Sequence, residues 1–343
     1  MLMVVFGAGA SYDSFPSRPL AEWPPGRLHY RLPLADELFD DRDLFNKWIA
    51  TFTRCQPVIP YLREVPEASS VERELEKLRA EAQTYSERHR QLAAVRFYLQ
   101  SILWECEDTL KKDPSTAVTS YKTLLDQIQS SRRKNEQVCL VTFNYDTMLE
   151  DALPMVGIKI DGLPDYIASN DYKIIKLHGS INWAHPVETP VENVNGRSNT
   201  DIANELIERV AKLKISPSFL MVNTYPSSKL HRMPLFPALA IPVETKQDYE
   251  CPPEHLEALR TCIPEVTKIL VIGWRATESN FLRLLSDNLR KEVHVMTVAG
   301  DQNRAVESNR RLQEAGIKGK FFTRDAGFSD FVVHREADGF LRS

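Results

Sequence analysis

Three polar side chains that could position water or transfer a proton follow apolar runs in the sequence. Asn144 and Asp146 come after the apolar residues 138–143, and His178 comes after the apolar residues 174–177. An amide can position water or a hydroxyl group, and a histidine near its ordinary pKa can accept the proton. Taken singly, each has a plainer interpretation, because Asn and Asp often cap helices and a histidine can be a satisfied buried side chain.

A glycine-rich turn follows another apolar run at the start of the chain. Residues 1–6 are apolar, and the turn that follows them consists of Gly7, Ala8, Gly9, Ala10 and Ser11. Such a run is typical of a buried parallel strand, and the turn lets backbone amides approach phosphate. The dinucleotide fingerprint G-x-G-x-x-G is incomplete, because Tyr12 occupies its third glycine position. The turn alone is therefore a weak signal.

The elements that must position these residues are the strands of one sheet. Apolar runs and helical patterns alternate again from residue 268 to residue 323. This alternation predicts an α/β fold with a doubly wound, Rossmann-like parallel sheet and helical insertions. Because ligands bind outside the carboxyl ends of such strands, we expect the three motifs to converge on one cleft.

The ordered set of motifs resembles the sirtuin-like domains. Gly-Ala-Gly-x-Ser occupies residues 7–11, Asn-x-Asp residues 144–146, and His-Gly residues 178–179. The longer stretches Thr-Phe-Asn-Tyr-Asp and Lys-Leu-His-Gly-Ser-Ile-Asn-Trp are similar to the bacterial anti-phage branch of that family, which contains NAD-hydrolysing effectors. The resemblance spans residues 4–323, but only the motif residues are specific.

The resemblance implies an NAD glycohydrolase, with NAD as substrate and no metal. Its catalytic residues would be Asn144, His178 and Asp146, although helix capping remains an equal alternative for Asp146. The residues implied in NAD binding are Gly7, Ala8, Gly9, Ala10, Ser11, Asp13, Phe143, Gly273, Trp274 and Asp301. Sirtuins often have a small polar residue after the glycine equivalent to Gly273, so Trp274 departs from the family at the adenosine side.

Two other functions remain open at this point. The same Asn144 and His178 would serve an NAD-dependent protein deacylase, and a degenerate site would serve a nucleotide-sensing assembly module. By family analogy, an anti-phage effector would respond to a separate activating protein, such as a translocase-type ATPase, or to a phage component. An apolar stripe over residues 71–110 also predicts a contact with a second subunit, in a homo-oligomer, or with a partner protein. The alternative is that this segment folds back on itself as a helical hairpin and buries the stripe internally.

The sequence predicts a domain division in which the sirtuin-like NAD-binding domain is formed by residues 1–34 and 136–343. A helical insertion would cover residues 35–135, and a second insertion with a loop and a helix would cover residues 184–235. Prolines exclude a long helix in residues 14–34, where the resemblance places a lid over ribose and nicotinamide. Further expectations are a helix that begins at Asp146 and a short strand at residues 238–243.

Composition limits the class of protein. The 343 residues include 43 basic and 47 acidic side chains, and the resulting net charge of −4 does not suggest a general nucleic-acid binder. Five cysteines without a Cys-x-x-Cys pair indicate free thiols rather than a four-cysteine zinc site. The sequence has neither a membrane-length apolar stretch nor a signal peptide, so we expect a cytoplasmic protein without a membrane partner.

Overall fold

The computed structural model describes residues 1–18, 22–23, 29–65, 69–133, 135–222, 228–230, 232–242 and 249–342. The chain forms two compact units. Met1–Trp23, Lys111–His178 and Lys246–Ser343 form the first, which we call the sheet unit. Pro24–Leu110 and Gly179–Thr245 form the second, which we call the helical unit. These boundaries differ from the expected ones, because residues 111–135 belong with the sheet and not with the helical insertion.

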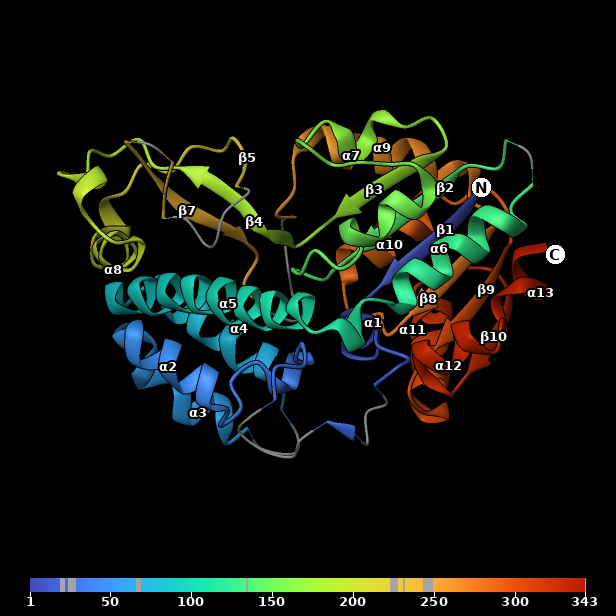
Figure 1. The fold of residues 1–343 in the computed structure, drawn as a ribbon, viewed down its shortest axis with the longest axis horizontal. Coiled ribbons are helices and arrows are strands. Elements are labelled where there is room, and N and C mark those ends of the chain that lie inside the picture. The colour runs from blue at the N-terminus through green and yellow to red at the C-terminus, as the bar shows by residue number, and fades with distance from the viewer. Residues whose placement is uncertain are drawn as a thin grey trace. The chain divides into compact units, whose positions relative to one another are not determined.

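A parallel sheet forms the centre of the sheet unit. Within the described residues it has six strands in the order β10-β9-β8-β1-β2-β3, and every neighbouring pair is parallel. The strands are β1 (Leu2–Phe6), β2 (Val138–Thr142), β3 (Tyr172–Lys176), β8 (Lys268–Ile272), β9 (Val293–Val298) and β10 (Gly319–Arg324). β1, β2 and β8 are buried at every residue, as continuous apolar runs predict for central parallel strands. Figure 1 shows this doubly wound α/β fold, which confirms the expected fold class.

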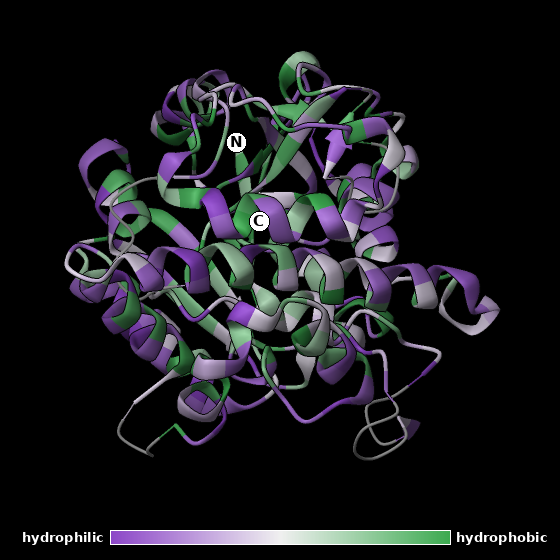
Figure 2. Cartoon of the chain, turned by 90° about the vertical axis from the view of Figure 1, so that its left-hand side faces the viewer, coloured by the Kyte–Doolittle hydropathy of each residue, from purple (hydrophilic) through white to green (hydrophobic). Residues whose placement is uncertain are grey.

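Helices connect and cover the strands of the sheet unit. They are α1 (Ala8–Tyr12), α6 (Ser120–Ser131), α7 (Asp165–Ala168), α9 (Pro253–Cys262), α10 (Ser279–Asn288), α11 (Gln302–Glu314), α12 (Gly327–Val333) and α13 (Ala337–Arg342). α12 and α13 both contact α6, while α7 and α9 lie beside β3 (Figure 1). Hydrophobic residues are concentrated in the strands and on the inner sides of the helices, as Figure 2 shows by colour. The helices α12 and α13, which follow the last strand, were not predicted.

The helical unit contains a helix pair where the sequence predicts the long stripe. The helices of this unit are α2 (Asp43–Thr51), α3 (Ile59–Arg63), α4 (Val71–Glu81), α5 (Ser86–Lys112) and α8 (Asn199–Arg209). Leu92, Leu99 and Leu103 on α5 are buried within the single chain. These leucines therefore leave no excess apolar surface that would support a contact with a second subunit, and the homo-oligomer stays a prediction.

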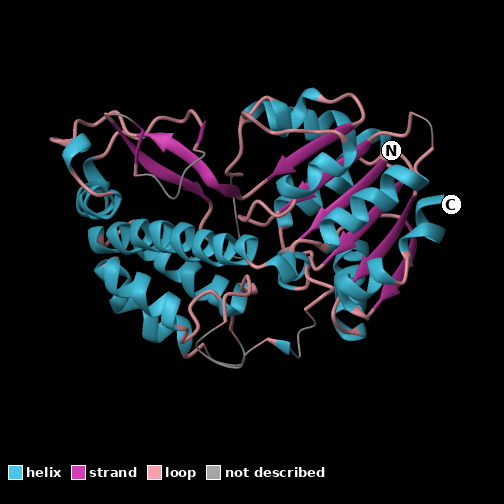
Figure 3. Cartoon of the chain, viewed as in Figure 1, coloured by secondary structure: helices cyan, strands magenta, loops and turns pink. Residues whose placement is uncertain are grey.

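A small antiparallel sheet completes the helical unit. Its order within the described residues is β5-β4-β7-β6, and Figure 3 shows its strands in magenta. The strands are β4 (Gly179–Pro186), β5 (Leu220–Met221), β6 (Lys229–Leu230) and β7 (Met233–Leu239). The prediction of a strand at residues 238–243 was thus too far toward the C-terminus, because β7 ends at Leu239. Val243 lies outside the described residues. The sheet was not predicted because Pro186, Pro234 and Pro237 interrupt its apolar pattern.

Candidate functional site

The candidate residues lie at the carboxyl edge of the parallel sheet. After β1, the next strands in the sequence, β2 and β3, are added on one side of β1. The chain then crosses to the other side of β1, where it forms β8. The boundary between β1 and β8 is therefore the switch point of this sheet, where ligands of open α/β sheets bind. Gly7, Phe143 and Gly273 directly follow the last residues of β1, β2 and β8. His178 lies two residues after the end of β3. These four positions thus share the carboxyl ends of neighbouring strands, while the single cleft expected from the sequence stays a prediction.

The glycine turn is closely packed against the residue that follows β8. The amide of Gly9 donates to the carbonyl oxygen of Gly273 over 3.1 Å, and a Cβ on Gly9 would lie 2.8 Å from Gly273 Cα. A Cβ on Gly273, whose φ is +60°, would lie 2.3 Å from the nitrogen of Ala10. The approach of two backbones therefore requires these glycines, independently of any ligand.

Three amides of this turn already have partners within the protein. Gly7 N donates to Ile272 O over 3.0 Å, Gly9 N to Gly273 O, and Ala10 N to Gly7 O over 2.9 Å. The expected phosphate contact by Gly7, Ala8, Gly9 and Ala10 stays a prediction. As the turn stands, that contact would have to use other donors than these three amides.

The side chain of Asn144 is held in a buried hydrogen-bond network. Its Nδ2 donates to Gly7 O and Ser11 Oγ, both over 2.9 Å, and Tyr121 OH lies within hydrogen-bond distance of it at 3.1 Å. Ser11 Oγ and Tyr121 OH also lie 3.0 Å apart, within hydrogen-bond distance. Thr142 Oγ1 accepts from the amide of Asn144 over 3.0 Å. Because the network uses the amide nitrogen, the amide oxygen of Asn144 is the atom left to hold water or a hydroxyl group.

Tyr121 is a site residue that sequence reasoning missed. It lies on α6, where its spacing with Leu124, Leu125 and Ile128 is that of an ordinary apolar helix face. Burial raises the pKa of Tyr121 well above its usual value, so its hydroxyl stays protonated and can donate. The sequence carries no signal that would separate this tyrosine from a core residue.

Asp146 stabilises the loop that follows β2. Its Oδ1 accepts from the amide of Met148 over 3.1 Å, and its side chain is buried. The residues after it form a turn and then a short 3-10 helix at Glu150–Val156, so the α-helix expected from Asp146 is not present. The observed contact is therefore loop stabilisation of the Asx-turn kind in place of helix capping, and a catalytic role of Asp146 stays a prediction.

His178 lies among aromatic side chains at the end of β3. Its ring centre is 4.8 Å from that of Phe143 and 6.2 Å from that of Tyr145, and the residue is buried. The preceding carbonyl, of Leu177, accepts from the amide of Glu250 over 3.0 Å, which fixes the backbone here. An imidazole at this edge can accept a proton from a bound water or hydroxyl group.

Phe143 and Trp274 pack against each other across the end of β1. Their ring centres are 5.2 Å apart with an interplanar angle of 14°, and Phe281 contacts both rings. Trp274 Nε1 donates to the carboxylate of Glu278. A Cβ on Gly7 would lie 2.6 Å from Trp274 Cα, so this tryptophan lies directly against the glycine turn. Binding of NAD by Phe143, Gly273 or Trp274 stays a prediction.

The carboxylates of Asp13 and Asp301 serve the helices near them. Asp13 Oδ2 accepts from the amide of Ser329 over 3.2 Å at the start of α12, and burial raises the pKa of Asp13. Asp301 Oδ1 accepts from the amide of Arg304 over 2.9 Å and caps α11. Ligand contacts by these two residues stay predictions, and each would compete with a contact already made.

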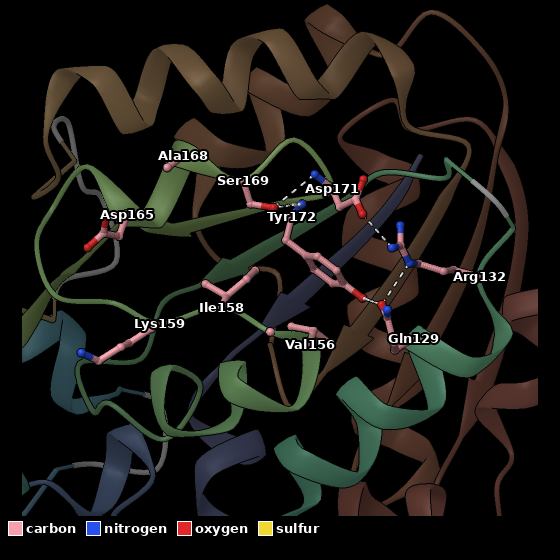
Figure 4. Close-up of a pocket in the computed structure, with 11 residues that line it drawn as sticks. Gln129, Arg132, Val156, Ile158, Lys159, Asp165, Ala168, Ser169, Asp171 and Tyr172 are labelled. Carbon is pink, nitrogen blue, oxygen red and sulfur yellow. Dashed lines mark hydrogen bonds and ion pairs between the residues drawn. The ribbon is translucent and has the colours of Figure 1, made fainter.

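A separate pocket lies at the opposite edge of the same sheet. It has a volume of ≈ 300 Å³ and is lined by the C-terminal end of α6, by residues 156–159, by α7 and the residues after it, and by the first residue of β3 (Figure 4). Arg132 Nη2 donates to Asp171 Oδ2 over 2.8 Å, and Tyr172 OH donates to Gln129 Oε1 over 2.8 Å. These polar groups pair with one another, and none of the candidate residues above lines the pocket.

Two further properties constrain the site. In the described part of the chain, no group of three or more His, Cys, Asp or Glu side chains is arranged to hold a metal ion. All five cysteines are free and buried. Over the same ranges, no helix has the length and apolar character that crossing a membrane requires.

Comparison with known proteins relates part of the chain to one family. Residues 138–225 match the family model described as "SIR2-like domain", and this segment contains Asn144, Asp146 and His178. The chain is similar to a Sir2 homolog in complex with NAD, at 14% identity over 98% of this chain and 90% of that chain, with a TM-score of 0.42. A mutant Sir2 homologue in complex with ADP-ribose is similar at 13% identity, over 98% and 92% of the two chains, with a TM-score of 0.45.

A third similar structure is Sir2Tm bound to a propionylated peptide. Its identity is 11%, over 99% of this chain and 94% of that chain, with a TM-score of 0.42. The search of curated proteins finds no match. Since these likenesses are distant, the roles of individual residues rest on the contacts of this chain.

Proposed function

We propose that this protein is an NAD glycohydrolase that releases nicotinamide and ADP-ribose. The observation that carries the proposal is the placement of Asn144 and His178 after two adjacent parallel strands, within the segment that matches the SIR2-like family. The switch point beside them is where a dinucleotide binds in sheets of this kind. NAD is therefore the substrate that the site and the family match favour.

The chemistry requires few catalytic groups. When the bond between nicotinamide and ribose breaks, nicotinamide leaves as a neutral molecule and positive charge develops on the ribose carbon. The amide oxygen of Asn144 would hold the attacking water or a ribose hydroxyl, because the amide nitrogen is fixed by Gly7 and Ser11. The imidazole of His178 would accept the proton that the water loses.

Incubation with NAD alone tests this proposal. We expect nicotinamide release without any acylated peptide, because no peptide is needed for hydrolysis. Strict dependence on an acetylated or propionylated peptide would contradict hydrolysis and favour the deacylase. Binding of NAD without turnover, in the presence and absence of peptide, would favour the nucleotide-sensing module.

An anti-phage role of this activity is a separate proposal, which rests on the motif resemblance. Depletion of NAD would stop an infected cell from supporting phage replication, and a separate protein or phage component would trigger it. Expression of the wild-type chain and of Asn144→Ala in bacteria challenged with phage tests this role. Equal phage growth in both strains would contradict it.

A further inference from the structure

One fully buried lysine connects the loop that carries Asn144 with the strand that precedes His178. Lys176 is the last residue of β3, two positions before His178, and its side chain is 0% exposed. Its Nζ donates to the backbone carbonyl oxygen of Asp146, two positions after Asn144. A single side chain thus connects the loop after β2 with the strand that leads to His178.

A buried carboxylate balances the charge of this lysine. Glu150 Oε1 lies 2.9 Å from Lys176 Nζ, and it also accepts from Tyr166 OH on α7 over 2.9 Å. Glu150 Oε2 is buried and has no hydrogen-bond partner among the described residues. Glu150 begins the 3-10 helix after the Asn144 loop, so the contacts of Lys176 with Asp146 O and Glu150 hold the middle and the C-terminal end of that loop against β3.

The energetics of such a pair favour a role in positioning. Removing two charges from water costs about as much as their attraction returns, and well-packed apolar replacements are often neutral or stabilising. The best-attested use of a buried polar pair is to specify one arrangement among several. Here the arrangement specified is that of a loop without regular secondary structure between Phe143 and Leu149.

From these contacts we infer that Lys176 and Glu150 are positioning residues, which set the position of the Asn144 loop relative to His178. The inference rests on the proposed function, because it assumes that these two residues act together on one substrate. Tyr166 contributes by orienting the Glu150 carboxylate. None of the three touches the reacting atoms in this account. Their effect is on geometry, where a displacement of about 1 Å can cost about 10²-fold in rate.

A second buried Lys–Glu pair in the same unit provides a matched control. Lys268 Nζ lies 3.3 Å from Glu136 Oε1 and donates to Leu341 O over 2.6 Å. Lys268 is the first residue of β8, at the amino edge of the sheet, whereas Lys176 is at the carboxyl edge. The two pairs therefore share their chemistry, and both are largely buried, but they lie at opposite ends of the strands and differ in their distance from the candidate site.

The experiment compares two double variants, Lys176→Met/Glu150→Met and Lys268→Met/Glu136→Met. Both should fold, because each replaces a whole ion pair with apolar side chains. We expect the first to lower kcat for NAD cleavage by about 10²-fold with KM little changed, and the second to keep the wild-type kcat. A folded Lys176→Met/Glu150→Met protein with wild-type kcat, or equal losses in both variants, would overturn the inference.

Hydrogen exchange separates this inference from the proposed function. Amides of residues 143–149 should exchange faster in Lys176→Met/Glu150→Met and at the wild-type rate in Lys268→Met/Glu136→Met. A wild-type protein that does not cleave NAD would end the proposed function, but this measurement would still test the positioning. Unchanged exchange in both variants would overturn the positioning role.

A milder pair of variants covers the case in which a double variant does not fold. Tyr166→Phe removes only the hydroxyl that contacts Glu150, and Tyr172→Phe removes a hydroxyl that contacts Gln129 away from the site. We expect faster exchange of residues 143–149 and a lower kcat in Tyr166→Phe alone. The same behaviour of both variants would contradict a specific positioning role.

Discussion

At the scale of single residues, the hydroxyl of Tyr121 is the least expected part of the site. It lies 3.1 Å from Asn144 Nδ2 and 3.0 Å from Ser11 Oγ, and its ring packs 5.0 Å from Phe6. An amide whose nitrogen is held by three oxygen atoms keeps its oxygen in one orientation. The network thereby prepares Asn144 for one task before any ligand arrives.

Tyr121→Phe should lower kcat for NAD cleavage, and its loss of stability alone should not explain this decrease. The matched control is Tyr98→Phe, because Tyr98 is equally buried and donates to Leu38 O over 2.8 Å in the helical unit. Tyr98→Phe removes one buried hydrogen bond and Tyr121→Phe removes two, and each lost bond should cost about 1 kcal/mol of unfolding free energy. Only Tyr121→Phe should lower kcat, as steady-state kinetics would measure. Equal kcat in the two variants would remove Tyr121 from the site.

At the scale of elements, the glycine turn and the end of β8 form one closely packed unit. We predict that Gly9→Ala lowers stability, because the new Cβ would lie 2.8 Å from Gly273 Cα. Overpacking of this kind costs about 1–3 kcal/mol. Gly300→Ala is the control, since a Cβ there would have no atom within 4 Å. Urea unfolding of both variants measures the difference, and an equally stable Gly9→Ala protein would contradict the close packing.

The sequence predicted the strands of the parallel sheet because continuous apolar runs at β1, β2 and β8 have few other interpretations. It also predicted that Asn144 and His178 follow adjacent strands. It could not predict Tyr121 or Lys176, because both reach the site from positions that their local pattern assigns to a helix core or a strand end. The antiparallel sheet was missed since prolines and a bulge between Gly179 and Ala184 break the alternation in β4 and β7.

The stripe on α5 leads to a different prediction now that its surroundings are known. Leu99 is 0% exposed within one chain, so Leu99→Ala should destabilise the monomer by about 2–5 kcal/mol. Tyr85→Ala is a suitable control because Tyr85 is 62% exposed. Thermal unfolding should detect the loss, while light scattering should give the same mass for the variant and the wild type. If Leu99→Ala were as stable as the wild type but had a smaller mass in light scattering, the result would instead support a contact between subunits through this stripe.

At the scale of the whole molecule, the free energy of unfolding should depend on pH through His29, which lies in the helical unit. Burial, together with the charges of Arg42 and Arg31, lowers the pKa of His29 from 6.5 to about 4. Between these values the unfolded chain binds a proton that the folded chain does not. The free energy of unfolding should therefore fall as the pH is lowered from 6.5 toward 4.

Thermal unfolding between pH 7 and pH 4.5 tests this dependence. The melting temperature of wild-type protein should fall with pH, and it should fall less in His29→Gln because that contribution is removed. His89→Gln, at an exposed position on α5, should behave as the wild type does. Identical pH dependence in all three proteins would show that His29 does not set the acid sensitivity.

The proposed function of this protein requires that the residues at the carboxyl ends of the parallel strands cleave NAD. The most direct measurement is nicotinamide release from NAD alone by the wild-type protein and by Asn144→Ala, with the fold of both confirmed by thermal unfolding. We predict release by the wild type and a loss of about 10²–10³-fold in the variant, because the group that holds the attacking water is removed. A folded Asn144→Ala protein that releases nicotinamide at the wild-type rate would contradict the account.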